Sequence, residues 1–120
     1  MRLGHWCMPL NARKYLHDIA RASDLIAEFV GSAGFDNYTD NAMLRAAVER
    51  EFEIIGEALS HLARLDEELI SNISEYRRII AFRNILIHGY AEIDDRLVWD
   101  IVESKLPILR REVAALMEGR

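Results

Sequence analysis

The sequence of 120 residues contains a single cysteine, Cys7, which excludes a disulfide within one chain. No apolar run approaches the roughly 20 residues that a membrane-spanning helix requires, and residues 1–10 lack the apolar centre of a secretory signal. No segment alternates polar and apolar side chains as a strand does, and no repeat or low-complexity tract is present. These absences favour an all-helical, cytoplasmic protein without a membrane partner.

Residues that ligate metals are scattered along the chain. His5, His17 and His61 occur in none of the spacings typical of zinc sites, and a second cysteine is missing. The acidic pair Asp94-Asp95 precedes a segment with helical periodicity, where two acids usually cap the helix. We therefore expect neither a metal site nor a cofactor.

The net charge of -5 argues against a general nucleic-acid binder, because Lys and Arg contacts to phosphates supply most non-specific affinity. One segment has the opposite balance of charge. Between Glu75 and Tyr90 the chain carries one acid and three arginines, Arg77, Arg78 and Arg83. We expect a basic patch in this region on an otherwise acidic body, whose remaining surface could face a protein partner.

Apolar residues recur at intervals of three and four along four long segments, which is the spacing of amphipathic helices. The predicted helices cover residues 12–30, 40–64, 75–89 and 95–116, with a loop at 32–37 and a short helical turn at 66–71. Gly31 should end the first helix. Thr39 or Asp40 should cap the second helix and Ser74 the third, while Pro107 should kink the fourth.

With 51% hydrophobic residues, the chain can bury one core but is too short for two domains. Short connections favour antiparallel neighbours, so we predict an up-down four-helix bundle that forms a single domain over residues 1–120, with 1–10 as an N-terminal extension. Gly56, deep in the second helix, indicates a close approach of helices within the bundle or across a dimer.

The candidate chemistry lies at the end of the third helix, in the segment Arg83-Asn84-Ile85-Leu86-Ile87-His88-Gly89-Tyr90. Arginine offers a charged fork that suits phosphate oxygens, and histidine can both take and give a proton near neutral pH. Asn84 and His88 should share one helical face, whereas Arg83 lies about 140° away from His88. A long arginine stem, a loosened last turn or the pairing of two chains could each overcome this separation.

The spacing of Arg83, His88 and Tyr90 resembles the R-x4-H-x-Y motif of the HepT family of HEPN-domain proteins. Three further blocks resemble that family in the same order, namely residues 53–58 (EIIGEA), 78–84 (RIIAFRN) and 98–100 (VWD). The resemblance spans about residues 12 to 116. It implies a HEPN-type bundle and a homodimer.

This resemblance also implies the toxin of a type VII toxin-antitoxin system, a metal-independent endoribonuclease. Arg83, Asn84 and His88 would be catalytic. From the charge balance of the predicted basic patch, we expect Arg77 and Arg78 to bind the RNA substrate. His88 would take a proton from the ribose 2′-OH, while the acid could be the His88 of a paired chain, water or Tyr90.

Tyr90 has a second role if the resemblance holds. In HepT systems the matching tyrosine accepts AMP from a nucleotidyltransferase antitoxin of the MntA type, and this modification silences the toxin. The added AMP would bring negative charge and bulk beside His88 and Arg83.

Two other functions stay open. The bundle could be a non-catalytic helper subunit that binds nucleotide or RNA for the transferase, with Arg83 and His88 only gripping phosphate. It could also be a plain dimeric scaffold.

Overall fold

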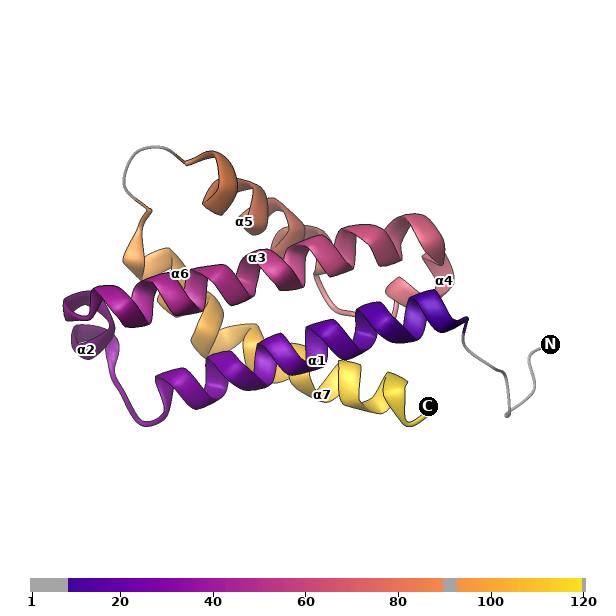
Figure 1. Ribbon diagram of the computed structural model, residues 1–120, viewed down its shortest axis with the longest axis horizontal. Coiled ribbons are helices and arrows are strands. Elements are labelled where there is room, and N and C mark those ends of the chain that lie inside the picture. The colour runs from indigo at the N-terminus through magenta and orange to yellow at the C-terminus, as the bar shows by residue number, and fades with distance from the viewer. Residues whose placement is uncertain (1–8, 90–92, 120) are drawn as a thin grey trace.

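The structure is a computed structural model that describes residues 9–89 and 93–119 of the chain. Four long helical segments run alternately up and down the molecule (Figure 1). They are α1 (Leu10–Val30), α3 (Ala42–Leu65), α5 (Tyr76–His88) and the consecutive pair α6 (Asp95–Ser104) and α7 (Leu106–Met117). No strand occurs within the described ranges, so the predicted all-α bundle is confirmed. None of the helices described is long and apolar enough to cross a membrane.

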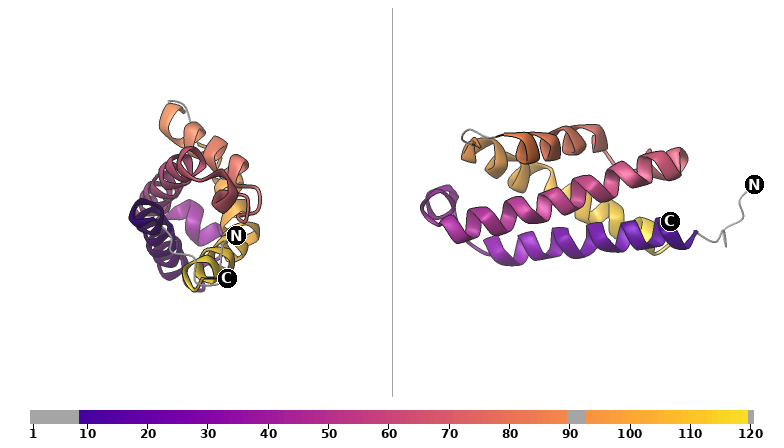
Figure 2. Two further views of the ribbon diagram at one scale, coloured as in Figure 1. Left: turned by 90° about the vertical axis from the view of Figure 1, so that its right-hand side faces the viewer. Right: turned by 45° about the horizontal axis from the view of Figure 1, so that its top comes forward.

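Helix α3 lies at the centre of the bundle, between α1 on one side and α5 on the other. Helix α7 packs along α1, so the order across the molecule is α5, α3, α1 and α7. Two further views show α5 at one edge of the bundle (Figure 2). Because α3 is its main neighbour, α5 turns much of its surface outward.

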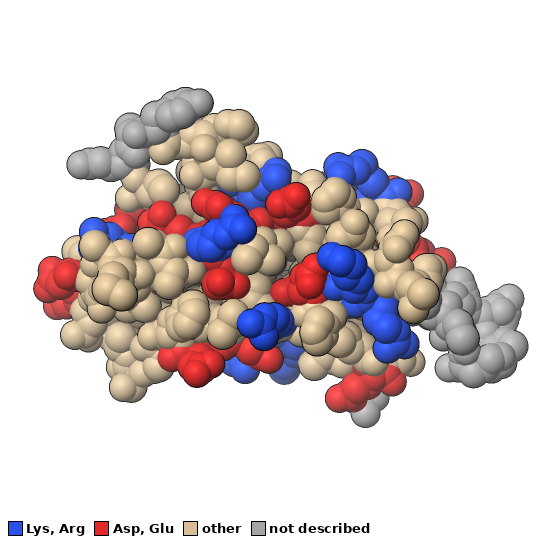
Figure 3. Space-filling view, viewed as in Figure 1, with Lys and Arg blue, Asp and Glu red and all other residues tan. Residues whose placement is uncertain are grey.

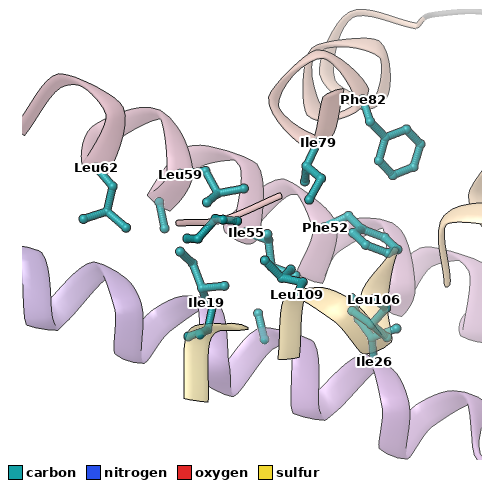
Figure 4. Packing of buried hydrophobic residues seen from close by; sticks show 14 of the residues in the cluster. Ile19, Ile26, Phe52, Ile55, Leu59, Leu62, Ile79, Phe82, Leu106 and Leu109 are labelled. Carbon is teal, nitrogen blue, oxygen red and sulfur yellow. The ribbon is translucent and has the colours of Figure 1, made fainter. Parts of the chain in front are cut away.

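Apolar side chains from all four segments form the core (Figure 4). Ile19 of α1 and Leu109 of α7 lie within the same buried cluster as the apolar face of α3. At the other side of α3, the rings of Phe52 and Phe82 meet edge to face with their centroids 5.2 Å apart. This geometry is favourable for aromatic pairs, so the two buried rings fasten α5 to α3.

Several predicted helix ends are confirmed. Gly31 follows α1 with φ +55°, a left-handed conformation that favours glycine. The predicted turn at 66–71 is the short helix α4 (Glu67–Ile70). The Asp94 side chain accepts the N–H of Arg96 at 3.0 Å and caps α6. At Lys105 the fourth helical segment breaks into two helices, and Pro107 lies in the first turn of α7, where its missing N–H costs little.

The predicted loop and cap before α3 are wrong. Residues Phe35–Asp40 form the short helix α2, because Tyr38 is fully buried there with its ring 5.4 Å from that of Trp99. Thr39 and Asp40 therefore belong to α2. Asn41 caps α3 instead, and its side chain accepts the Leu44 N–H at 3.0 Å.

The predicted cap of α5 is also wrong. Ser74 donates its backbone N–H to the Glu112 carboxylate of α7 at 2.8 Å, a contact between distant parts of the sequence. Helix α5 begins after Glu75, which has the left-handed φ of +55°. Hydrogen bonds from Lys105 and Arg78, each 2.8 Å long, hold the Glu75 carboxylate and lower its pKa.

Candidate active site

Helix α5 divides the candidate residues between two faces. Its buried face packs on α3 through Ile79, Phe82 and Leu86. Its exposed stripe consists of side chains that lie within about 40° of His88 around the helix axis, namely Arg77, Ala81, Asn84 and His88. The stripe therefore presents the predicted Asn84 and His88 together to the solvent.

Arg83 joins this exposed stripe through Asn84. Its guanidinium donates from Nη1 to Asn84 Oδ1 at 3.1 Å, although its stem lies half-buried beside α3. Helix α5 remains regular through His88, so the last turn does not loosen. Of the three ways to overcome the angular separation, the length of the arginine stem is the one seen within the chain.

The guanidinium of Arg83 has no carboxylate partner among the described residues. In the part of the chain that the structure describes, Arg83 takes part in no ion pair, and its Nε is buried without a hydrogen-bond acceptor. A guanidinium that is not neutralised by a carboxylate can bind phosphate oxygens in a bidentate manner. Arg83 is thus suited to hold a phosphodiester near Asn84.

His88 is the last residue of α5, and its side chain is exposed. The next residue, Gly89, donates its N–H to the carbonyl oxygen of Ile85 at 2.8 Å. A Cβ at position 89 would lie only 2.6 Å from that oxygen, so a larger residue would strain the end of the helix. Gly89 therefore allows the chain to leave the helix directly after the histidine.

Tyr90 lies outside the described residues. Its predicted role as the AMP acceptor stays a prediction.

Arg77 and Arg78 lie at the other end of α5, roughly 15 Å along the helix axis from His88. Arg77 belongs to the exposed stripe, and its guanidinium lies 4.9 Å from the centre of the Tyr76 ring. Arg78 points about 80° away from the stripe and pairs with Glu75 at 2.8 Å. The structure therefore links Arg83 to Asn84, places Asn84 and His88 on one face of α5, and leaves the other two arginines apart.

The surface charge is mixed on the face shown in Figure 3, where basic and acidic side chains alternate. On this face, the end of α5 beside the grey residues shows no Lys, Arg, Asp or Glu side chain. Within residues 9–89 and 93–119, no three His, Cys, Asp or Glu side chains are grouped so that they could hold a metal ion.

One feature of the site could not be assigned from sequence. Gly56 was expected at a close helix contact, and the structure shows that the residue opposite it is Arg83. A glycine inside a long helix was the available signal, but the identity of its partner depends on how α3 and α5 pack.

The fold and these side chains define an all-helical protein with an Arg-Asn-His cluster suited to phosphodiester chemistry. Residues 19–116 match the family described as HepT-like ribonucleases, and the chain belongs to this family. The resemblance drawn from the sequence motifs is thereby confirmed.

Individual relatives agree with this assignment. The chain is similar to a protein of Methanocaldococcus jannaschii that bears the name "Putative RNase MJ1380", with 34% identity over 103 residues that cover 86% of this chain and 94% of that protein. It is also 34% identical over 103 residues to a protein of Thermococcus cleftensis named "Probable ribonuclease HepT", covering 86% and 93% of the two chains. No solved structure matches the chain.

Proposed function

We propose that this chain is the toxin of a type VII toxin-antitoxin system and cleaves RNA without a metal ion. The observation that supports the proposal is the hydrogen bond from Arg83 Nη1 to Asn84 Oδ1, which brings the guanidinium to a residue of the exposed stripe that ends in His88. Membership in the HepT-like ribonuclease family supports RNA as the substrate class. We further propose that residues 1–120 form a single HEPN domain that acts in the cytoplasm, with 1–10 as an N-terminal extension.

The proposed reaction is an attack of the ribose 2′-OH on the neighbouring phosphorus. His88 takes the proton of the 2′-OH as the P–O2′ bond forms, and the P–O5′ bond breaks. An acid returns a proton to the leaving 5′ oxygen, which yields a 2′,3′-cyclic phosphate and a 5′-hydroxyl. Arg83 stabilises the negative charge on the phosphoryl oxygens, while Asn84 holds the guanidinium in place.

A homodimer would supply the acid as the His88 of the second chain. The surface beside His88 is apolar, because Ile85 and Ile87 are 49% and 42% exposed. A groove of about 200 Å³ adjoins Ile85 and is also lined by Leu97 and Ile101 of α6. Two-fold symmetry is the commonest way in which such a surface is covered by an identical chain.

Mixing two inactive variants tests the dimer. A heterodimer of an Arg83→Ala chain with a His88→Ala chain should recover cleavage if each site takes residues from both chains. Light scattering that finds only monomer at micromolar concentration would rule the dimer out. A dimer whose mixed variants stay inactive would mean that each chain carries a separate site.

The two remaining arginines should contribute differently to RNA binding, because they lie differently relative to the exposed stripe. Arg77 lies on the stripe with His88, whereas Arg78 points aside and is paired with Glu75. Arg77→Ala should therefore weaken RNA binding and lower the salt dependence of the affinity by about one unit of slope, as loss of one phosphate contact does. Arg78→Ala is the matched control, and an equal effect of both variants would contradict this assignment.

Control by AMP transfer to Tyr90 belongs to the same proposal. A nucleotidyltransferase antitoxin of the MntA type, with ATP, should add one or more AMP units to the chain and abolish cleavage. Tyr90→Phe keeps the ring and should prevent both effects. A fully modified Tyr90→Phe protein in intact-mass spectra would show that another residue accepts AMP.

Cleavage of RNA in excess EDTA tests the proposed activity as a whole. The wild-type protein should remain active, and His88→Ala should lower the rate on the order of 10²-fold or more, as loss of an acid-base group does. Strict dependence on an added metal would contradict the proposal. Tight RNA binding without turnover would instead favour the non-catalytic helper subunit.

A further inference from the structure

Helices α3 and α5 approach each other closely where Gly56 faces Arg83. A Cβ built at Gly56 would lie 2.6 Å from Cγ of Arg83 and still closer to its Cβ. Real side chains do not tolerate such distances, so the stem of Arg83 occupies the space that any other residue at position 56 would need. The contact involves the side chain that the proposed function places on the phosphate.

Within the described residues, the stem of Arg83 is held in place by packing and not by an ion pair. No carboxylate pairs with Arg83 among residues 9–89 and 93–119, and its buried Nε lacks an acceptor. Its one hydrogen bond runs from Nη1 to Asn84 on the exposed stripe. The stem is therefore fixed by the surface of α3, and only the tip of the guanidinium is fixed by a polar contact.

Glycine is a poor residue for the middle of a helix, and α3 is a regular helix on both sides of position 56. Since alanine would favour the helix, we attribute the glycine at position 56 to a lack of room for a side chain there. The room is taken by Arg83, because the three atoms nearest to the built Cβ are Cβ, Cγ and Cδ of this side chain.

We infer that Gly56 is the positioning residue for Arg83: the missing side chain sets where the guanidinium stands relative to His88. This inference rests on the proposed function. A methyl group at position 56 moves the stem of Arg83 away from α3 and its guanidinium away from the scissile phosphate. Gly56 itself touches neither substrate nor reacting atoms.

Gly56→Ala tests this role by its effect on kcat. Misplacing a group that acts on the transition state by about 1 Å can cost roughly 10²-fold in rate, so kcat should fall by about that factor with a smaller change in KM. The matched control is Ala58→Val, which overpacks a buried position of the same helix and should keep kcat for the folded protein. Equal losses of kcat in the two variants would overturn the inference.

The NMR signal of the Arg83 Nε–H group reports the position of this side chain and should not change when the protein is merely destabilised. In nitrogen-15-labelled protein this signal is identified by its absence in Arg83→Lys. Gly56→Ala should shift this signal and speed its exchange with solvent, since Nε leaves its buried position, whereas Ala58→Val should leave it unchanged. An unaltered Arg83 signal in Gly56→Ala would overturn the inference.

A reciprocal pair of substitutions covers the case in which Gly56→Ala does not fold. In the wild-type protein, Gly56→Ala should lower the melting temperature because the new methyl group meets the stem of Arg83. Arg83→Gly removes all the side-chain atoms that the methyl group meets, so in that background Gly56→Ala should raise the melting temperature, as alanine favours the helix. Destabilisation in both backgrounds, or an unfolded double variant, would overturn the inference. A wild-type protein that cleaves no RNA contradicts the proposed function, whereas an active protein whose Gly56→Ala variant keeps its kcat contradicts this inference alone.

Discussion

Replacing Asn84 with alanine should slow RNA cleavage with little effect on the stability of the fold. The Asn84 side chain is exposed, and the hydrogen bond from Arg83 Nη1 to its Oδ1 at 3.1 Å links it to another element of the site. Alanine is a better helix former than asparagine by up to about 0.7 kcal/mol. This gain partly offsets the loss of the hydrogen bond, so the variant should unfold at or slightly below the melting temperature of the wild-type protein.

The size of the kinetic effect follows from that one contact. A hydrogen bond from a charged donor contributes about 1.5–3 kcal/mol, and exposure to water places this one at the low end. Nε of Arg83 has no acceptor in the part of the chain that the structure describes, so among these residues the loss of Asn84 leaves only the packing of the stem to hold the guanidinium. A loss near 1.4 kcal/mol corresponds to a decrease in kcat of about tenfold.

Steady-state cleavage of a labelled RNA oligonucleotide measures this change. Asn11→Ala, an exposed asparagine of α1, is the matched control and should keep the wild-type rate. In an Arg83→Ala background the further change Asn84→Ala should have little effect, because the hydrogen bond has already lost its donor. A wild-type rate for Asn84→Ala, or an equal loss with and without Arg83, would refute the reasoning.

Three further predictions concern stability. Phe82→Ala should lower the free energy of unfolding by about 3–5 kcal/mol in denaturant titrations, because the ring fastens α5 to Phe52, whereas alanine at the half-exposed Ile85 should cost far less. Asp94→Ala removes the cap of α6 and should cost about 1 kcal/mol, and an unchanged denaturation midpoint would show that the cap is not needed. Burial and the nearby Asp95 carboxylate raise the pKa of Glu49, so ionising this carboxyl group costs more free energy in the folded than in the unfolded protein. Glu49→Gln should therefore raise the melting temperature at pH 7. This gain should disappear as the pH falls through the pKa of Glu49 in the folded protein to below about 4, where the side chain is protonated in both states. A gain that does not depend on pH would contradict this cause.

Local patterns in the sequence were enough to locate the main helices. The intervals between apolar residues, together with Gly31 and Asp94, fixed the ends of two segments because capping acts over a few residues. The cap of α3 was missed since it depends on whether α2 forms. That in turn depends on contact between Tyr38 and Trp99, which lie far apart in the sequence.

The candidate site shows the same division between local and long-range information. Helical spacing alone put Asn84 and His88 on one face, and the structure agrees with this. The position of Arg83 could not be derived in that way, because it depends on the space that Gly56 leaves in α3. Likewise, the pairing of Glu75 with Lys105 requires the break between α6 and α7 to lie beside the start of α5.

The most direct test of the central claim compares two oligonucleotides in excess EDTA, one all-RNA and one with a single 2′-deoxy nucleotide at the site of cleavage. We predict that the wild-type protein cuts the all-RNA oligonucleotide to give 2′,3′-cyclic phosphate ends and leaves the deoxy-substituted position intact. The rate of cleavage of the all-RNA oligonucleotide should fall on the order of 10²-fold in His88→Ala. Cleavage of the deoxy-substituted position, or full activity of His88→Ala, would contradict the central claim.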